Sequence, residues 1–240
     1  MQFMNRFWVV LPLLFMAAPQ TCQGIDWQAF DDPTGVLLTE PFAKSISELP
    51  ASEKAAAVLR LQESLKSKDI EICRRAALTL GNLGDKSGVP VMIKALSTAE
   101  GSDRNNVVVA LRILKDERAI PTLRKALKDE SPYVRAIAVA ALGELKASQV
   151  YDEIVLLTKD KGDKPGKKEG TLNCLPTSPA ALACYALGNL DEPRAIPVLI
   201  KLLDDQDLRV PAAQALEALT QQKLGNDPEK WKAWWKDKNQ

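Results

Sequence analysis

Residues 116–145 read DERAIPTLRKALKDESPYVRAIAVAALGEL, and residues 191–219 read DEPRAIPVLIKLLDDQDLRVPAAQALEAL. Both stretches open with Asp-Glu, continue through Ala-Ile-Pro into a leucine-containing segment, and close on an alanine- and leucine-rich phrase. Related phrases recur as LTLGNLGD at 78–85 and ALRILKD at 110–116. Internal similarity of this kind is typical of repeat proteins, in which each unit stacks on its neighbours to bury an apolar face.

Two independent anchors define the register of the repeats. The first anchor is the leucine of each motif, at spacings of 31, 31, 45 and 29 residues: Leu80, Leu111, Leu142, Leu187 and Leu216. The second is a proline ten residues after its own leucine, found at Pro90, Pro121 and Pro197. The fourth repeat therefore carries about fourteen extra residues, in an insertion at 158–178.

Each repeat is predicted to form two helices. The first, the A helix, is short and opens with or near proline, which suits the first turn of a helix. The second, the B helix, has apolar or small residues at helical spacing, as in Val134, Ala138, Ala141, Leu142 and Leu145. The pattern predicts five helical pairs between residues 51 and 223.

These phrases resemble the short HEAT-like repeats first named for phycobilisome lyases. The resemblance covers about residues 51–223 and predicts an all-α fold, a right-handed α-α superhelix (α-solenoid) of about five HEAT-like pairs with a C-terminal Trp-rich capping helix. It implies a protein-binding scaffold and says little about a particular chemistry, because function depends on sites added to a fold.

The segments outside the array have separate expected roles. Residues 1–24 combine a basic start with the apolar run FWVVLPLLFMAA and are predicted to be a signal peptide. Residues 25–50 are expected to be irregular and to lie over the first pair. Residues 224–240 are predicted to form a capping helix whose Trp231, Trp234 and Trp235 share one face and cover the open end of the last repeat.

The fate of residues 1–24 and the state of the cysteines each have two interpretations. Cys22 follows the apolar run, so acylation there is one reading and simple cleavage between about 18 and 24 is the other. The expected location is the periplasm or the outer membrane, or outside the cell. In an oxidising compartment Cys174 and Cys184 would pair, and two buried thiols are the alternative.

Composition removes several function classes. The 240-residue chain contains no histidine, which excludes the commonest general base and metal sites that need imidazole. The 32 basic residues balance 31 acidic ones, so a face that grips nucleic-acid phosphates is not expected. We expect no cofactor, no metal, no nucleic acid and no catalysis, with membrane contact only through a lipid on Cys22.

One arginine recurs near the start of the B helices, as Arg104, Arg135 and Arg209, whereas Cys73 and Ala180 occupy its place in the first and fourth repeats. In HEAT-like families such an arginine commonly pairs with an aspartate of an adjoining repeat. The resemblance therefore implies a structural ladder, with Asp129 and Asp205 as nearby partners. Ligand binding is the alternative interpretation.

The concave wall of a solenoid is built from B helices, and residues off their core stripe are the candidates for partner contact. One aligned row is Leu78, Val109, Ala140, Tyr185 and Gln214, and a second is Asn82, Ile113, Glu144, Asn189 and Ala218. The proposed contact set is Leu78, Asn82, Val109, Glu144, Tyr185, Asn189 and Gln214. The alternative is that neighbouring helices cover most of these residues.

The insertion holds five lysines and three acidic residues between 159 and 170. Its GDKPGKK phrase lacks the spacing, the Ser or Thr and the preceding strand of a phosphate loop. A polar loop is one interpretation, and contact with an acidic partner or anionic lipid headgroups is the other.

Three functions follow from the sequence. The first is a non-catalytic scaffold or adaptor of the bacterial envelope that binds a partner protein along its concave B-helix face. The second is a HEAT-repeat enzyme of the bilin-lyase type, or a carrier of a small ligand. The third is a lipid-anchored structural subunit of an envelope complex.

Overall fold

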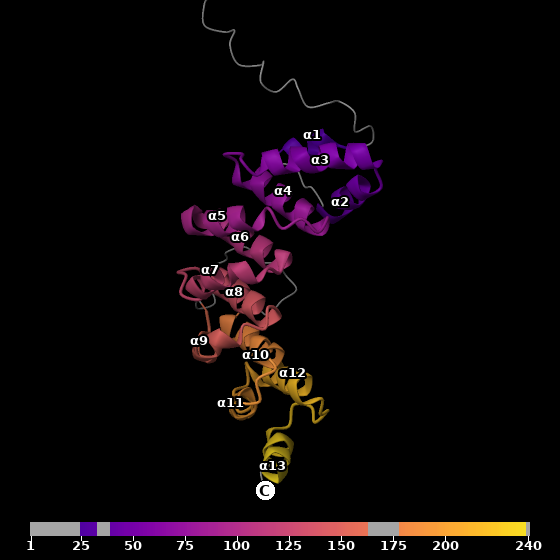
Figure 1. Cartoon of the computed structure of the whole chain (residues 1–240). Helices are drawn as coiled ribbons and strands as arrows, with labels where there is room; N and C mark the ends of the chain where they lie inside the picture. Colours follow the sequence, from indigo (N-terminus) through magenta and orange to yellow (C-terminus); the bar gives the residue numbers. More distant parts are fainter. Residues whose placement is uncertain (1–24, 33–38, 163–177, 239–240) are drawn as a thin grey trace, which may run out of the picture. The chain divides into compact units, whose positions relative to one another are not determined.

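The computed structural model describes residues 25–32, 39–162 and 178–238, and every regular element in them is helical (Figure 1). The helices fall into two compact units, one ending at Gly88 and one beginning at Val89. The predicted signal peptide, Cys22, Cys174 and residues 163–177 of the insertion lie outside the described residues.

The first unit holds four helices: α1 (Trp27–Asp31), α2 (Thr39–Ser47), α3 (Ala51–Ser64) and α4 (Ile70–Asn82). The helices α3 and α4 are the first predicted pair. Helix α4 begins where the Asp69 carboxylate accepts hydrogen bonds from the amides of Glu71 and Ile72, at 2.8 and 3.4 Å. This aspartate is an N-cap, which satisfies amides that have no partner inside the helix.

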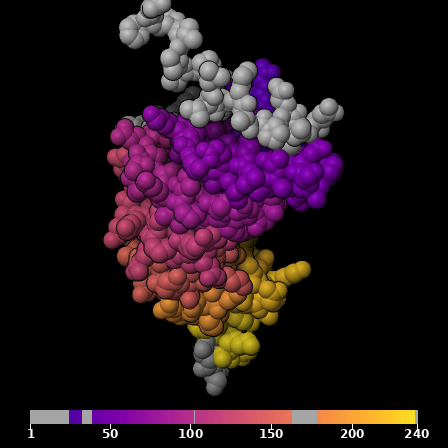
Figure 2. Space-filling view, turned by 45° about the horizontal axis from the view of Figure 1, so that its top comes forward, coloured from indigo at the N-terminus to yellow at the C-terminus, as the bar shows by residue number. Residues whose placement is uncertain are grey.

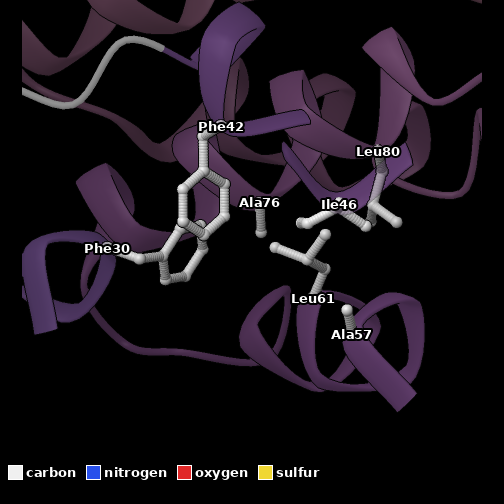
Figure 3. Packing of buried hydrophobic residues seen from close by; sticks show 7 residues of the cluster. All are labelled: Phe30, Phe42, Ile46, Ala57, Leu61, Ala76 and Leu80. Carbon is white, nitrogen blue, oxygen red and sulfur yellow. The ribbon is translucent and has the colours of Figure 1, made fainter. Parts of the chain in front are cut away.

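The segment before the first pair differs from the expectation of an irregular chain, because it contains α1 and α2. As predicted, it does pack on the pair: Phe30, Phe42 and Ile46 share a buried cluster with Leu61 of α3 and Leu80 of α4 (Figure 3). The rings of Phe30 and Phe42 are stacked with centroids 5.4 Å apart. Helices this short depend on such packing, which local periodicity does not reveal.

The second unit alternates the remaining A and B helices. The A helices are α5 (Val89–Thr98), α7 (Ile120–Ala126), α9 (Tyr151–Leu157) and α11 (Ala195–Leu202). The B helices are α6 (Gly101–Leu114), α8 (Pro132–Glu144), α10 (Pro179–Asn189) and α12 (Arg209–Thr220). Helix α13 (Pro228–Lys238) follows. Within this unit the A helices lie along one side of the stack and the B helices along the other (Figure 1).

The B helices form the inner, closely packed layer of the second unit. Helix α8 packs on α6 and α10, and α10 packs on α12, whereas α7, α9 and α11 make no comparable contacts with one another. Gly143 of α8 permits this approach, since a Cβ there would lie 2.6 Å from the Cα of Ala186. The close helix contacts of this unit are therefore concentrated in its B layer.

Successive repeats of the second unit follow one another in chain order, as the colours of the space-filling view show (Figure 2). Helix α13 packs on α11 and closes the array at its C-terminal end. Its Trp231 side chain is fully buried and donates from Nε1 to the carbonyl of Gly225 at 2.7 Å. Trp234 and Trp235 are half-buried.

Candidate binding surface

The first aligned row of B-helix residues is more buried than the contact hypothesis requires. Leu78 of α4 is 3% exposed, and Ala140 of α8 is buried too. Neither side chain is open to a partner, because neighbouring helices cover it, so Leu78 is corrected from a contact residue to a core residue. Val109 and Tyr185 are half-buried, and Gln214 is exposed. The Tyr185 hydroxyl donates to Oε1 of Gln214 at 2.8 Å and links α10 to α12.

The second aligned row is open to solvent. In the first unit Asn82 is exposed. In the second unit Ile113 is 51% exposed, and Asn189 and Ala218 are exposed. Glu144 is half-buried and accepts hydrogen bonds from Nε and Nη2 of Arg112, at 2.8 and 2.6 Å. It therefore joins α6 to α8 instead of standing free.

Two of the three recurring arginines form ion pairs with the next repeat. Arg104 lies 3.5 Å from the carboxylate of Asp129 and 2.5 Å from that of Glu130. Arg135 donates to both oxygens of Asp160, at 2.6 and 3.2 Å. Burial alone would raise the pKa of Asp160, but the hydrogen bonds from Arg135 and from the amide of Gly162, together with the charge of Arg135, hold that pKa below its ordinary value.

The Arg135 guanidinium also serves its own repeat. Its Nη1 donates to the carbonyls of Asp129 and Glu130, at 2.8 and 2.9 Å. Arg209, in the last repeat, also donates to a carbonyl of its own repeat: its Nε lies 2.9 Å from the carbonyl oxygen of Leu203. In the first repeat the Cys73 thiol occupies the arginine position and donates to the carbonyl of Ser67 at 3.2 Å.

The ladder is interrupted at Ala180 of α10. Asp205, which aligns with Asp129 and Asp160, is not met by an arginine there. It lies 3.4 Å from Nζ of Lys161, which is also 3.4 Å from Asp207. A hydrogen bond from the amide of Asp207, and then the one from Lys161, lower the pKa of Asp205.

A hollow of about 470 Å³ lies at this interruption, between the starts of α10 and α12. Its walls are mainly apolar, with one lysine and one aspartate at the rim: Lys161, Ser178, Ala180, Ala181, Tyr185, Asp207, Leu208, Val210 and Pro211. Val210 is 47% exposed. Of the predicted contact residues, Tyr185 lines this hollow and Gln214 is its hydrogen-bond partner.

Sequence reasoning missed three residues of this surface. Val210 lies off both aligned rows. Arg112 cannot be matched to Glu144 from local sequence, because the two residues are 32 positions apart. The sequence places Lys161 in the lysine-rich insertion, and its contact is indicated only by the aspartate at position 205 opposite the alanine at position 180.

The cysteines that the structure describes are both buried. Burial raises the pKa of the Cys184 thiol to about 12, so the thiol carries its proton at neutral pH. Burial also raises the pKa of Cys73. The Cys174 side of the predicted disulfide lies outside the described residues, and that pairing stays a prediction.

Among residues 25–32, 39–162 and 178–238, no cluster of three or more acidic, cysteine or histidine side chains is arranged to hold a metal ion. Within the same ranges, no helix combines the length and the apolar character that a membrane span needs.

Comparison with known families agrees with the repeats. A model of HEAT repeats matches residues 58–143 and 93–165, and a model of the PBS lyase HEAT-like repeat matches residues 180–205. This chain belongs to the HEAT-like repeat proteins. The predicted all-α repeat fold is confirmed. No curated protein matches the sequence at a significant level.

The HEAT-like architecture recurs among solved structures. One is described as the complex of CpcE and CpcF of phycocyanin lyase from Nostoc sp. PCC7120. The similarity has a TM-score of 0.52 at 23% identity and covers 79% of this chain and 68% of that one. At this identity the likeness establishes the fold alone.

Proposed function

We propose that this HEAT-like protein is a non-catalytic scaffold that binds a partner protein along the B-helix face of its second unit. The observation that carries the proposal is a set of exposed residues on the B helices of that unit. Ile113 and Val210 place apolar side chains there, 51% and 47% exposed, and Asn189 adds an amide. Apolar contacts flanked by a few hydrogen-bonding groups suit a helix or extended segment of another protein.

The same face is held in a fixed shape, which favours binding. The pairs Arg112 with Glu144 and Tyr185 with Gln214 join successive B helices. Lys146 and Asp191 form a further ion pair between repeats. A surface that is already ordered loses little conformational entropy when a partner docks. The solved neighbour is itself described as a complex of two proteins, which supports a protein partner.

Site-specific photo-crosslinking tests the proposal. A photoreactive amino acid is placed at position 113 or 189 on the B-helix face, and at position 156 as the control. Leu156 is the matched control because it is 64% exposed and apolar but lies on the A helix α9. We expect a discrete cross-linked protein from positions 113 and 189 and none from 156 in cells that produce the chain naturally. Cross-links from position 156 alone would contradict the proposal.

An enzyme of the bilin-lyase type is the second candidate, supported by the PBS lyase HEAT-like match and by the phycocyanin-lyase neighbour. The protein is incubated with phycocyanobilin and followed by its visible absorption. A saturable spectral shift of the bilin, lost in a variant altered on the B-helix face, would favour the lyase. An unchanged spectrum would favour the scaffold.

Export to the envelope is part of the proposal and rests on the sequence of residues 1–24. Intact mass spectrometry of the chain recovered from its own cells tests it. A mass lacking the first residues supports export, and an added diacylglyceryl group on Cys22 supports the lipid-anchored form. A chain of full length would contradict both.

A further inference from the structure

We propose that the hollow at Ala180 receives an arginine side chain of the partner protein, which completes the interrupted ladder. The inference rests on the proposed function, because it names the chemistry of the partner at one point of the B-helix face. It is carried by the comparison of three equivalent positions within the second unit.

The aspartates at the three equivalent positions have the same local geometry. One oxygen of each aspartate accepts a hydrogen bond from the amide two residues later: Asp129 from Ser131 at 2.9 Å, Asp160 from Gly162 at 3.0 Å and Asp205 from Asp207 at 2.9 Å. This turn orients each carboxylate toward the preceding B helix. At the first two positions the carboxylate meets a guanidinium, from Arg104 and Arg135.

The third position keeps the aspartate but has alanine in place of the arginine, so Asp205 is met by Lys161 instead. Ala180 ends at its Cβ and lines a hollow of about 470 Å³ that extends to Asp207. The walls of Leu208, Val210 and Pro211 suit the methylene stem of an arginine. Asp207 at the rim suits its guanidinium, and Asp205 contacts the same lysine as Asp207. Arginine is the side chain that matches a carboxylate by two parallel hydrogen bonds, as Arg135 does with Asp160.

Lys161 occupies the site only loosely. Its ammonium lies 3.4 Å from both Asp205 and Asp207, against 2.6 Å for Nε of Arg135 and Asp160, and its side chain is 65% exposed. An exposed lysine contact of this kind contributes little, so a partner arginine can displace it. The insertion at 163–177 contains no arginine, so this part of the chain has no guanidinium to offer.

The test uses the full 15N-labelled chain and the peptide acetyl-Gly-Arg-Gly-amide. Backbone amide shifts are followed at Ala181, Tyr185, Asp207 and Leu208. We expect weak, saturable shifts confined to these residues. The citrulline peptide, which has the same shape without the charge, should bind at least about tenfold more weakly, and so should the lysine peptide.

Four variants locate the effect. Ala180→Arg fills the hollow from within and should abolish peptide binding. Asp205→Asn removes the charged acceptor and should weaken binding roughly tenfold, whereas Asp129→Asn, the same change at a filled step, should leave it unaltered. Lys161→Ala removes the competitor and should strengthen binding about two- to threefold. The amide spectrum of each variant reports whether it is folded.

Several outcomes would overturn the inference: no saturable shifts, equal binding of the citrulline peptide, or undiminished binding by Ala180→Arg. The same shifts produced by raising the protein concentration alone would identify a second copy of this chain as the occupant and would overturn it too. Cross-links from position 113 or 189 together with a failed peptide titration would support the scaffold proposal and contradict only the proposed arginine site. Peptide binding without any such cross-link would contradict the scaffold proposal, and with it the inference that the arginine belongs to a partner protein.

Discussion

Arg135 illustrates at the residue scale how neighbouring repeats are held in register. One guanidinium contacts the carboxylate of Asp160 in the next repeat and two carbonyls of its own repeat. The side chains of the ion pair are 18% and 24% exposed, so water screens them only in part. Charge-assisted hydrogen bonds in such surroundings contribute more than those of a freely exposed pair.

Arg135→Ala should lower the free energy of unfolding by about 2–3 kcal/mol, because it leaves a carboxylate and two carbonyls without their donor. Arg118→Ala is the control, since Arg118 pairs with Asp116 beside it in the same loop and is 54% exposed. The control should lower the free energy of unfolding much less, because water screens an exposed ion pair. Urea unfolding followed by circular dichroism measures both, and equal losses would argue against the ladder.

The Asp160 carboxylate makes this contact dependent on pH. Its pKa is lower in the folded chain than its ordinary value, so the pair stabilises the fold above the unfolded pKa of about 3.9. That stabilisation is lost as the pH falls through the folded pKa. Between pH 5 and pH 2 the stability of Asp160→Asn should therefore fall less steeply than that of the unaltered chain. Parallel curves of urea midpoint against pH would contradict this assignment.

At the scale of helices, the B layer depends on close backbone contact. Gly143 lies against Ala186, and Gly188 lies against Ala215, where a Cβ would come within 2.9 Å of backbone atoms. The small residues of the repeated phrases, such as ALGEL and ALGNL, are what permit this approach of neighbouring helices. They could not show how completely the approach would cover Leu78 and Ala140, because burial depends on the side chains of neighbours far along the chain.

Gly143→Ala tests the close contact. Alanine favours a helix over glycine by about 1 kcal/mol, yet the added Cβ would lie 2.6 Å from the Cα of Ala186. Backbone atoms cannot rotate away, so the clash should prevail and destabilise the chain by about 1–3 kcal/mol. Hydrogen exchange should quicken first in α8 and α10. A stabilised variant would show that the two helices can separate without loss.

Helix pairs were predictable from the sequence because their leucine and proline anchors recur, and the N-terminal helices were not. Helix α2 has Phe42, Ala43 and Ile46 on one side, too few positions to establish a period. The break in the arginine ladder was visible at Ala180, but the hollow beside it was not. A hollow is a property of side chains from two helices together.

For the molecule as a whole, the last repeat of the second unit needs a cap, because no further repeat covers its apolar face. Trp231 of α13 supplies it, with its indole fully buried and hydrogen-bonded to Gly225. Lys232 adds an ion pair to Asp204 at 3.2 Å. Repeat proteins are stabilised by contacts between nearest neighbours, so a cap acts most strongly on the repeat beside it.

Trp231→Ala should therefore destabilise the C-terminal end by about 3–5 kcal/mol. Faster hydrogen exchange is expected in α11, α12 and α13, with little change in α5 and α6. Trp235→Ala, at a half-buried position, should have a smaller effect. Uniformly faster exchange through the second unit would instead mean that the repeats unfold as a single cooperative block.

The backbone hydrogen bond from the amide of Ala180 to the carbonyl of Asp160 spans the insertion at 3.0 Å. Helix α10 packs on α8 beside it, although the repeat spacing in the sequence rises from 31 to 45 residues there. Closing a loop of twice the length costs only about 0.6 kcal/mol more. Homologous chains can therefore gain or lose residues at this junction while the stack stays as it is, so variation in length should concentrate between Asp160 and Ala180.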